Sequence, residues 1–313
     1  MTSAFNLAFV FPGQGSQTVG MGRELRDAIA ESKEIFRLAD DALGFSLSKL
    51  CFEGPEVELR KTSNTQPALL TVSVAATEAI KSKGIRPSVA AGHSVGEYAA
   101  LVAAGALEFT EAVRLVRKRG QLMQQAEELG TGTMAAIIGL STEVVLEVVA
   151  QAQEAGIVDV ATLNGPGQTV VSGETAAVER ACEIAAEKGA KRAIKLNVSG
   201  AFHSRLMSDA AEAISGDLAN CNIREAEIPI VANATADYVR KPDEIRAALA
   251  KQIVGAVRWE ESVRRMVADG VTTFIEAGPG QVLQGLSKRI DSSVGIFGVG
   301  DVTSLDELVA ALD

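Results

Sequence analysis

A serine between two glycines is the feature of this sequence with the clearest chemical meaning. Ser94 lies in Gly92-His93-Ser94-Val95-Gly96, the Gly-x-Ser-x-Gly pattern of a nucleophile elbow. An apolar run at 87–91 predicts a buried strand before it, and an alanine-rich segment at 97–104 predicts a helix after it. The N–H groups at such a helix N-terminus stabilise the oxyanion of an acyl-transfer intermediate. The alternative is a glycine-rich turn whose serine only caps the helix.

A serine hydroxyl needs a base within hydrogen-bond reach to act as a nucleophile. The sequence has only two histidines. His93 directly precedes Ser94, and adjacent side chains leave a strand end in opposite directions, so we expect His93 to line the pocket rather than serve as the base. His203 lies in a predicted loop and is the candidate base, although an isolated histidine more often has a structural role. No acidic residue stands out as its orienting partner.

Arg119 is a candidate anion-binding residue. A helix is predicted over 110–129, with Thr110 as its N-cap. At 100° per residue, Arg119 falls in the middle of the apolar face of this helix. Burying an unpaired charge is costly. Arg119 therefore either binds an anion or packs its aliphatic stem and extends its guanidinium into water.

A glycine-rich loop follows the first predicted strand, which covers 5–11. This loop, Pro12–Gln17, can bring backbone close to a ligand. A dinucleotide-binding loop is one alternative, but its pattern requires Gly or Ala at the position of Thr18. The match to that pattern therefore fails.

Strands and helices alternate through most of the chain, which predicts a parallel sheet with helices on both faces. In this part, helices are predicted up to about 44 and over 66–83, 207–220, 242–252, 258–269 and up to 290, with strands over 228–232 and 272–276. Residues 131–199 differ, because their predicted order is strand, helix, strand, strand, helix, strand, as in a ferredoxin-like unit. We therefore expect a large α/β domain from 1–130 and 200–313, and a small inserted subdomain from 131–199.

Composition restricts the possible partners. The formal net charge of this 313-residue chain is -10, which argues against nucleic acid and anionic membranes as partners. Three scattered cysteines fit no metal-ligand spacing and indicate a reducing compartment. The apolar run at 5–11 is too short for a signal-peptide core, and no stretch approaches the roughly 20 apolar residues of a membrane span. We expect a cytoplasmic protein without a metal site.

A set of motifs occurs along the chain in a fixed order. The motifs are Phe11–Gln17, Gly92–Tyr98, Arg119-Gly120 with Met123-Gln124, Ala201–Ser204 with Leu206-Met207, and Glu276–Gly280. Together they resemble the malonyl-CoA:acyl carrier protein transacylase family. The resemblance extends from about residue 5 to residue 290. It implies a hydrolase-like α/β domain with a ferredoxin-like insert, the same architecture that the predicted elements favour.

The resemblance also implies roles for single residues. Ser94 and His203 would form a catalytic dyad, with the backbone N–H groups of Gln14 and Val95 as the oxyanion hole. Arg119 would hold the malonyl carboxylate through two parallel hydrogen bonds. The histidine would be oriented by a backbone carbonyl, that of Gln252. Further substrate-binding positions are His93, Asn164 and Phe202, of which Phe202 would exclude methyl-branched acyl groups.

The reaction that the resemblance implies is a ping-pong transfer through a malonyl-serine, in fatty acid or polyketide synthesis. The substrates would be malonyl-CoA and a phosphopantetheinylated acyl carrier protein, bound transiently by a monomer without a bound cofactor. Carrier proteins are acidic, so a local basic surface is expected. We define the basic patch as Lys191, Arg192, Lys195, Arg205, Lys288 and Arg289.

Three alternatives stay open at this point. The residues of the basic patch can instead be separate surface charges that keep the protein soluble and do not bind a carrier protein. A hydrolase can use the same elbow, with water in place of the carrier thiol, although Arg119 would then have no evident purpose. The third alternative is a protein that binds acyl-CoA without turnover. The presence of both Ser94 and His203 argues against it.

Overall fold

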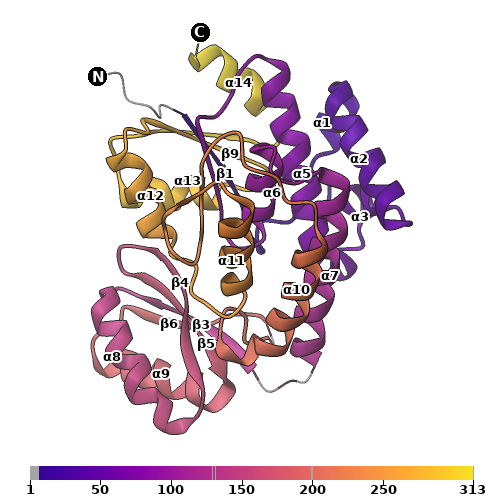
Figure 1. The fold of residues 1–313 in the computed structure, drawn as a ribbon. Coiled ribbons are helices and arrows are strands. Elements are labelled where there is room, and N and C mark those ends of the chain that lie inside the picture. The colour runs from indigo at the N-terminus through magenta and orange to yellow at the C-terminus, as the bar shows by residue number, and fades with distance from the viewer. Residues whose placement is uncertain (1–6, 129, 131, 199, 313) are drawn as a thin grey trace.

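The computed structural model describes residues 7–128, 130, 132–198 and 200–312 (Figure 1). The larger of its two sheets has six strands in the order β10-β9-β1-β2-β7-β8. Neighbouring strands from β10 to β7 run parallel, and β8 is antiparallel to β7. The strands are β1 Leu7–Phe11, β2 Val89–Gly92, β7 Ile230–Val231, β8 Tyr238–Val239, β9 Thr273–Ala277 and β10 Gly295–Val299.

Helices cover both faces of this sheet, as the alternating pattern predicts. Side chains alternate along a strand, so Phe9 and Phe11 of β1 pack into one apolar cluster and Ala8 and Val10 into another. The first cluster contains residues of the long central helix α5, and the second contains residues of α12 and α13. The helices in this part of the chain are α1 Arg23–Ala28, α2 Ala30–Leu43, α3 Leu47–Glu53, α4 Glu56–Leu59, α5 Thr62–Ser82, α6 Gly96–Ala103, α7 Phe109–Glu128, α10 Ser208–Asn220, α11 Pro242–Gln252, α12 Trp259–Ala268, α13 Val282–Ile290 and α14 Val302–Leu312, with the 3-10 turn η2 Arg205–Met207.

The second sheet is formed by the segment expected to be a small subdomain. Its four antiparallel strands have the order β4-β5-β3-β6. The elements follow the chain as β3 Gly132–Ile138, α8 Thr142–Ala152, η1 Gln153–Ala155, β4 Val158–Gly165, β5 Gln168–Glu174, α9 Thr175–Glu187 and β6 Arg192–Lys195. Helices α8 and α9 form a separate apolar cluster with one face of this sheet. In Figure 1 the unit lies at the bottom of the view, away from both chain ends. Its opposite face is free to form a wall of the cavity described below.

Several sequence expectations need correction. The helix expected from residue 66 begins at Thr62. Pro67 therefore lies inside this helix, where it has no N–H to donate to the Ser63 carbonyl. Arg117 Nη1 donates to that carbonyl instead, at 2.5 Å. Thr110 is not an N-cap, because α7 begins at Phe109 and the Glu108 carbonyl already accepts the Ala112 N–H.

Short or half-buried elements were not predicted at all. These are α3, α4, β8, β10 and α14. The sequence analysis predicts a strand at 272–276 and none after it, yet β10 follows and pairs in parallel with β9. Four of the five residues of β10 are only partly buried, so this edge strand lacks a strong apolar signal. Among the described residues, no helix combines the length and the apolar character needed to cross a membrane.

Candidate active site

The turn between β2 and α6 has the geometry of a nucleophile elbow. Ser94 adopts a φ of 52°, a left-handed conformation that is strained for a serine. A Cβ on Gly92 would lie 1.9 Å from the carbonyl carbon of Gly96, and a Cβ on Gly96 would lie 2.2 Å from the carbonyl oxygen of Phe11. Both positions therefore require glycine, and the turn holds the serine side chain away from the strand and the helix.

His203 lies next to Ser94, as the sequence analysis expects for the base. The Ser94 Oγ and His203 Nε2 atoms are 2.8 Å apart, and His203 Nδ1 is 2.8 Å from the carbonyl oxygen of Gln252. A carbonyl can only accept, so Nδ1 carries the proton and Nε2 is free to accept the serine hydroxyl proton. Burial, together with the nearby Arg119 charge, lowers the pKa of His203 to about 3. The imidazole is therefore neutral and able to act as a base.

Arg119 is fully buried, with an exposed fraction of 0%, so its guanidinium does not extend into water. Its Nη1 donates to Gln66 Oε1 at 2.6 Å, and its Nη2 donates to Ser94 Oγ and to Gln252 Oε1, each at 3.1 Å. Burial lowers the pKa of Arg119 from its usual value, but a guanidinium still remains charged at neutral pH. The structure thus fixes a cation directly beside the candidate nucleophile.

A cavity of about 200 Å³ opens over Ser94 between the two sheets. All the predicted site residues except Gln252 line it. The four-stranded sheet contributes Met134, Thr162 and Val170 to the wall, and Met123 comes from α7. The cavity thus combines an apolar lining with a serine, a histidine and an arginine at one end, which suits a small acyl group that carries a charge.

The remaining predicted residues surround this group. His93 Nε2 lies 2.8 Å from Asn164 Oδ1, so the residue before the nucleophile contacts β4 of the small sheet. Burial lowers the pKa of His93, and its contact with Asn164 places it away from the role of base. Val95 directly precedes α6 and is buried, and Phe202 is buried beside His203. Gln14 is exposed in the loop after β1, and its Nε2 donates to Thr62 Oγ1 at 3.3 Å.

Sequence reasoning missed three buried polar residues that form hydrogen bonds with Arg119, Ser94 or Gln252. Gln66 accepts from Arg119, Asn233 accepts the backbone N–H of Ser94, and Glu97 accepts from Gln252 Nε2 at 2.7 Å. Glu97 is 2% exposed, and its burial raises its pKa to about 7. Its place directly after the Gly-x-Ser-x-Gly pattern was the one available signal for Glu97. Neither Gln66 nor Asn233 has a local signal, because each reaches the site from a different element.

Part of the basic patch lies at one end of the small sheet. Arg289 Nη1 donates to Gln168 Oε1 at 2.8 Å, and Gln168 is opposite Ile138. Arg192 is opposite Ile138 on its other side, and the Lys191 N–H donates to the Ile138 carbonyl at 2.8 Å. Arg289, Lys191 and Arg192 therefore lie at the same end of the small sheet, although Arg289 is far from the other two in the sequence.

Two other members of the basic patch are partly neutralised. Arg205 forms an ion pair with Asp159 at 2.5 Å, and Lys195 forms one with Glu179 at 2.8 Å. Glu179 belongs to α9, so Lys195 reaches toward the helical side of the small sheet. These two cations contribute less net positive charge to the surface than the sequence suggests.

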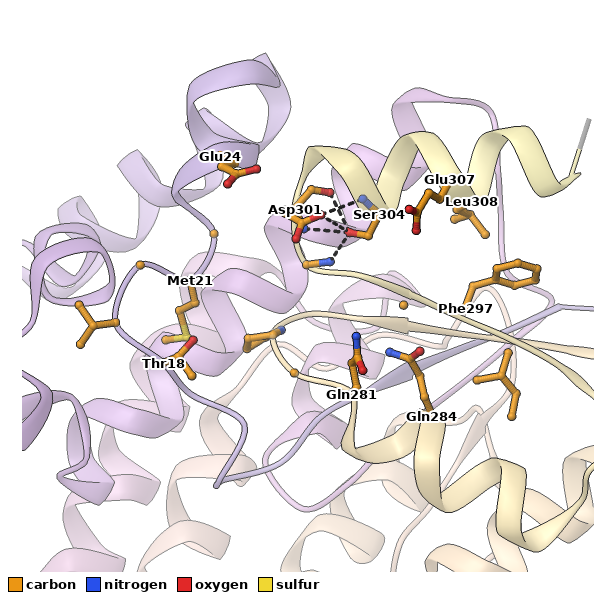
Figure 2. Close-up of a pocket in the computed structure, with 18 residues that line it drawn as sticks. Thr18, Met21, Glu24, Gln281, Gln284, Phe297, Asp301, Ser304, Glu307 and Leu308 are labelled. Carbon is orange, nitrogen blue, oxygen red and sulfur yellow. Dashed lines mark hydrogen bonds between the residues drawn. The ribbon is translucent and has the colours of Figure 1, made fainter.

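A second, larger depression of about 630 Å³ lies near the carboxyl ends of β9 and β10, beside the loop that follows β1 (Figure 2). Gln281 and Gln284 lie across it from Asp301 and Ser304, and Figure 2 also shows Glu24 and Glu307 on its rim. None of the predicted site residues lines it. Among the described residues, no group of three or more His, Cys, Asp or Glu side chains is placed to hold a metal ion.

Comparisons with known proteins identify the family and several relatives of this chain. The acyl transferase domain family matches residues 8–300 of the chain. The malonyl CoA-acyl carrier protein transacylase of Bacillus subtilis strain 168 is 48% identical over 307 residues, which cover 98% of this chain and 97% of that protein. The protein of the same name from Escherichia coli K12 is 46% identical over 284 residues, 90% of this chain and 92% of that protein.

Solved structures give the same result. An acyl carrier protein S-malonyltransferase from Vibrio cholerae superposes with a TM-score of 0.95 at 45% identity, over 97% of this chain and 99% of that chain. A malonyl-transacylase solved in complex with a type II polyketide-synthase acyl carrier protein superposes with a TM-score of 0.95 at 42% identity, over 98% of this chain and 99% of that chain.

Proposed function

The chain belongs to the acyl transferase domain family, and we propose that it moves the malonyl group of malonyl-CoA to the phosphopantetheine thiol of an acyl carrier protein. The observation that carries this proposal is the position of Arg119. A fully buried guanidinium whose Nη2 lies 3.1 Å from Ser94 Oγ suits an acyl group that ends in a free carboxylate. The relatives named above are malonyl transferases, in agreement with that chemistry.

The reaction proceeds in two half-reactions at Ser94. His203 Nε2 takes the hydroxyl proton while Oγ attacks the thioester carbonyl of malonyl-CoA. The backbone N–H groups of Gln14 and Val95 stabilise the oxyanion. The C–S bond then breaks, His203 returns its proton to the CoA sulfur, and malonyl-serine remains. In the second half-reaction, the carrier thiol gives its proton to His203, attacks the malonyl-serine carbonyl, and displaces Ser94, which is reprotonated by His203.

Specificity comes from two contacts. Arg119 pairs with the malonyl carboxylate, and an acetyl group would supply no counter-charge to that buried cation. Phe202, buried beside His203, limits the room for a methyl branch at the malonyl carbon. His93 and Asn164, joined at 2.8 Å, complete the wall of the site.

We propose that two parts of the chain have separate tasks. A hydrolase-like domain, assigned to 1–130 and 200–313, carries the dyad, and a ferredoxin-like subdomain, assigned to 131–199, closes the cavity. A docking surface for the acidic carrier protein, in fatty acid or polyketide synthesis, is offered by the end of the small sheet that carries Lys191, Arg192 and Arg289. The protein works as a cytoplasmic monomer without a bound cofactor.

The test is an intact-mass measurement after mixing the protein with malonyl-CoA in the absence of carrier protein. We expect one malonyl adduct, located on the peptide that contains Ser94, which is discharged when carrier protein is added. Free malonate without an adduct would show a hydrolase instead. The absence of both adduct and turnover would contradict the proposal.

A further inference from the structure

The side chain of Asn233 spans the turn that carries the nucleophile. Its Oδ1 accepts the backbone N–H of Ser94 at 2.7 Å, and its Nδ2 donates to the carbonyl of Gly92 at 2.6 Å. One amide group therefore contacts the residues on both sides of His93. Asn233 is 1% exposed, so water cannot replace these hydrogen bonds if the side chain is removed.

Such a contact matters because the turn is strained. Ser94 has a φ of 52°, and a non-glycine residue keeps this conformation only when its surroundings hold it there. The Gly92 carbonyl ends β2, and the Ser94 N–H lies between that strand and α6. A relaxation of the turn would move Oγ away from His203 Nε2, its partner at 2.8 Å.

The backbone of Asn233 is itself held in place by hydrogen bonds to Glu97 and Arg258. Its backbone N–H donates to Glu97 Oε2 at 3.1 Å, and its carbonyl accepts the Arg258 N–H at 3.0 Å. Glu97 also accepts from Gln252 Nε2 at 2.7 Å, and the Gln252 carbonyl orients His203. The supports of the nucleophile and of its base thus meet at one buried carboxyl group.

We propose that Asn233 is a positioning residue that fixes the backbone of Ser94 through a two-point amide contact with Gly92 and Ser94. This inference rests on the proposed function only for the choice of substrate in the assay. Because Ser94 takes part in both half-reactions, loss of the contact slows malonylation and discharge together. Because Asn233 acts on the serine backbone and not on Arg119, the preference for malonyl over acetyl groups is unchanged.

The experiment compares Asn233→Ala with Ser32→Ala as a matched control. Ser32 is equally buried, and its Oγ donates to the Ala75 carbonyl at 2.8 Å, outside the cavity. Both variants lose a buried polar contact, so a general loss of stability affects both. We expect Asn233→Ala to lower kcat by about 100-fold, an effect that a misplacement of about 1 Å can have, with little change in KM. Ser32→Ala should retain the wild-type kcat.

A second substitution separates the two contact points. In Asn233→Asp the carboxylate can accept the Ser94 N–H but has no donor for the Gly92 carbonyl. Its size is nearly unchanged, so it serves even if the alanine variant does not fold by circular dichroism. We expect kcat to lie between those of the wild type and Asn233→Ala. A wild-type kcat in Asn233→Asp at a pH where the new carboxyl is ionised would overturn the two-point contact, because only a protonated carboxyl could donate to the Gly92 carbonyl.

The rate at which phenylmethylsulfonyl fluoride modifies Ser94, followed by mass spectrometry, separates this inference from the proposed function. It reports the reactivity of the serine without malonyl-CoA, and we expect it to fall in Asn233→Ala and not in Ser32→Ala. If the wild type reacts with this reagent but transfers no malonyl group, the proposed function fails and the reagent still tests Asn233. Equal rates in the two alanine variants, or a changed malonyl-to-acetyl ratio in Asn233→Ala, would refute the role given to Asn233.

Discussion

Replacement of Arg119 by glutamine tests the link between the buried cation and the choice of acyl group. In the free protein, Arg119 donates hydrogen bonds to Gln66, Gln252 and Ser94 Oγ. In the malonyl complex, its loss leaves a buried carboxylate without a counter-charge, which costs about 3–5 kcal/mol. This corresponds to a fall of about 10²- to 10⁴-fold in kcat/KM for malonyl-CoA. An acetyl group has no carboxylate to lose, so its transfer should be unchanged or faster.

The assay measures malonylation and acetylation of Ser94 in single turnovers and compares the two values of kcat/KM. Arg117→Gln is the matched control, because Arg117 lies on the same helix but donates to the Ser63 carbonyl outside the cavity. The glutamine at 119 places no charge in the interior, so we expect that variant to fold. The malonyl-to-acetyl ratio of kcat/KM in Arg119→Gln can also stay within about twofold of that in the control, a difference smaller than the energy of one hydrogen bond. That result would show that Arg119 does not bind the malonyl carboxylate.

Three further predictions concern stability and docking. The pKa of His203 is about 3 in the folded protein and 6.5 for the free group. As the pH falls below 6.5, the unfolded chain therefore binds a proton that the folded protein does not, and the free energy of unfolding decreases. His203→Gln should reduce the loss of unfolding free energy between pH 8 and pH 5 by about 2 kcal/mol in urea titrations; an unchanged loss would mean that His203 is not buried as a neutral group. Gly92→Ala should lower Tm sharply or prevent folding, because its Cβ would meet the Gly96 backbone at 1.9 Å, whereas Gly216→Ala, with open space around it, should not; equal Tm values would contradict the elbow geometry. Added salt should slow transfer to carrier protein but not to free pantetheine, and equal slowing of both would argue against docking on the basic patch.

Elements with strong periodicity could be predicted from the sequence, and weak ones could not. The alternation of strands and helices, and the strand and helix order in 131–199, follow from apolar patterns that a local stretch of chain carries. The edge strand β10 is half-buried and has no such pattern, so it was missed. The N-cap assigned to Thr110 was wrong because α7 begins at Phe109 and the carbonyl of Glu108, two residues before Thr110, already accepts the Ala112 N–H.

The sequence by itself determined the chemistry that is available. Gly92 and Gly96 permit the turn, Ser94 lies on it, and Arg119 falls on an apolar helix face, where its charge must either be matched or be extended into water. Each of these conclusions depends on residues within one turn or one helix, where geometry follows directly from spacing.

Only the tertiary structure decided how these groups meet. The contacts of Ser94 with His203 and Asn233 join positions 109 and 139 residues apart, and that of Arg119 with Gln252 joins positions 133 apart. The burial of Glu97 likewise depends on Gln252 and Asn233, which arrive from other elements. Local spacing carries no information about such contacts, because they form only when the parallel strands bring their carboxyl ends to one edge and α7 and α11 pack against them.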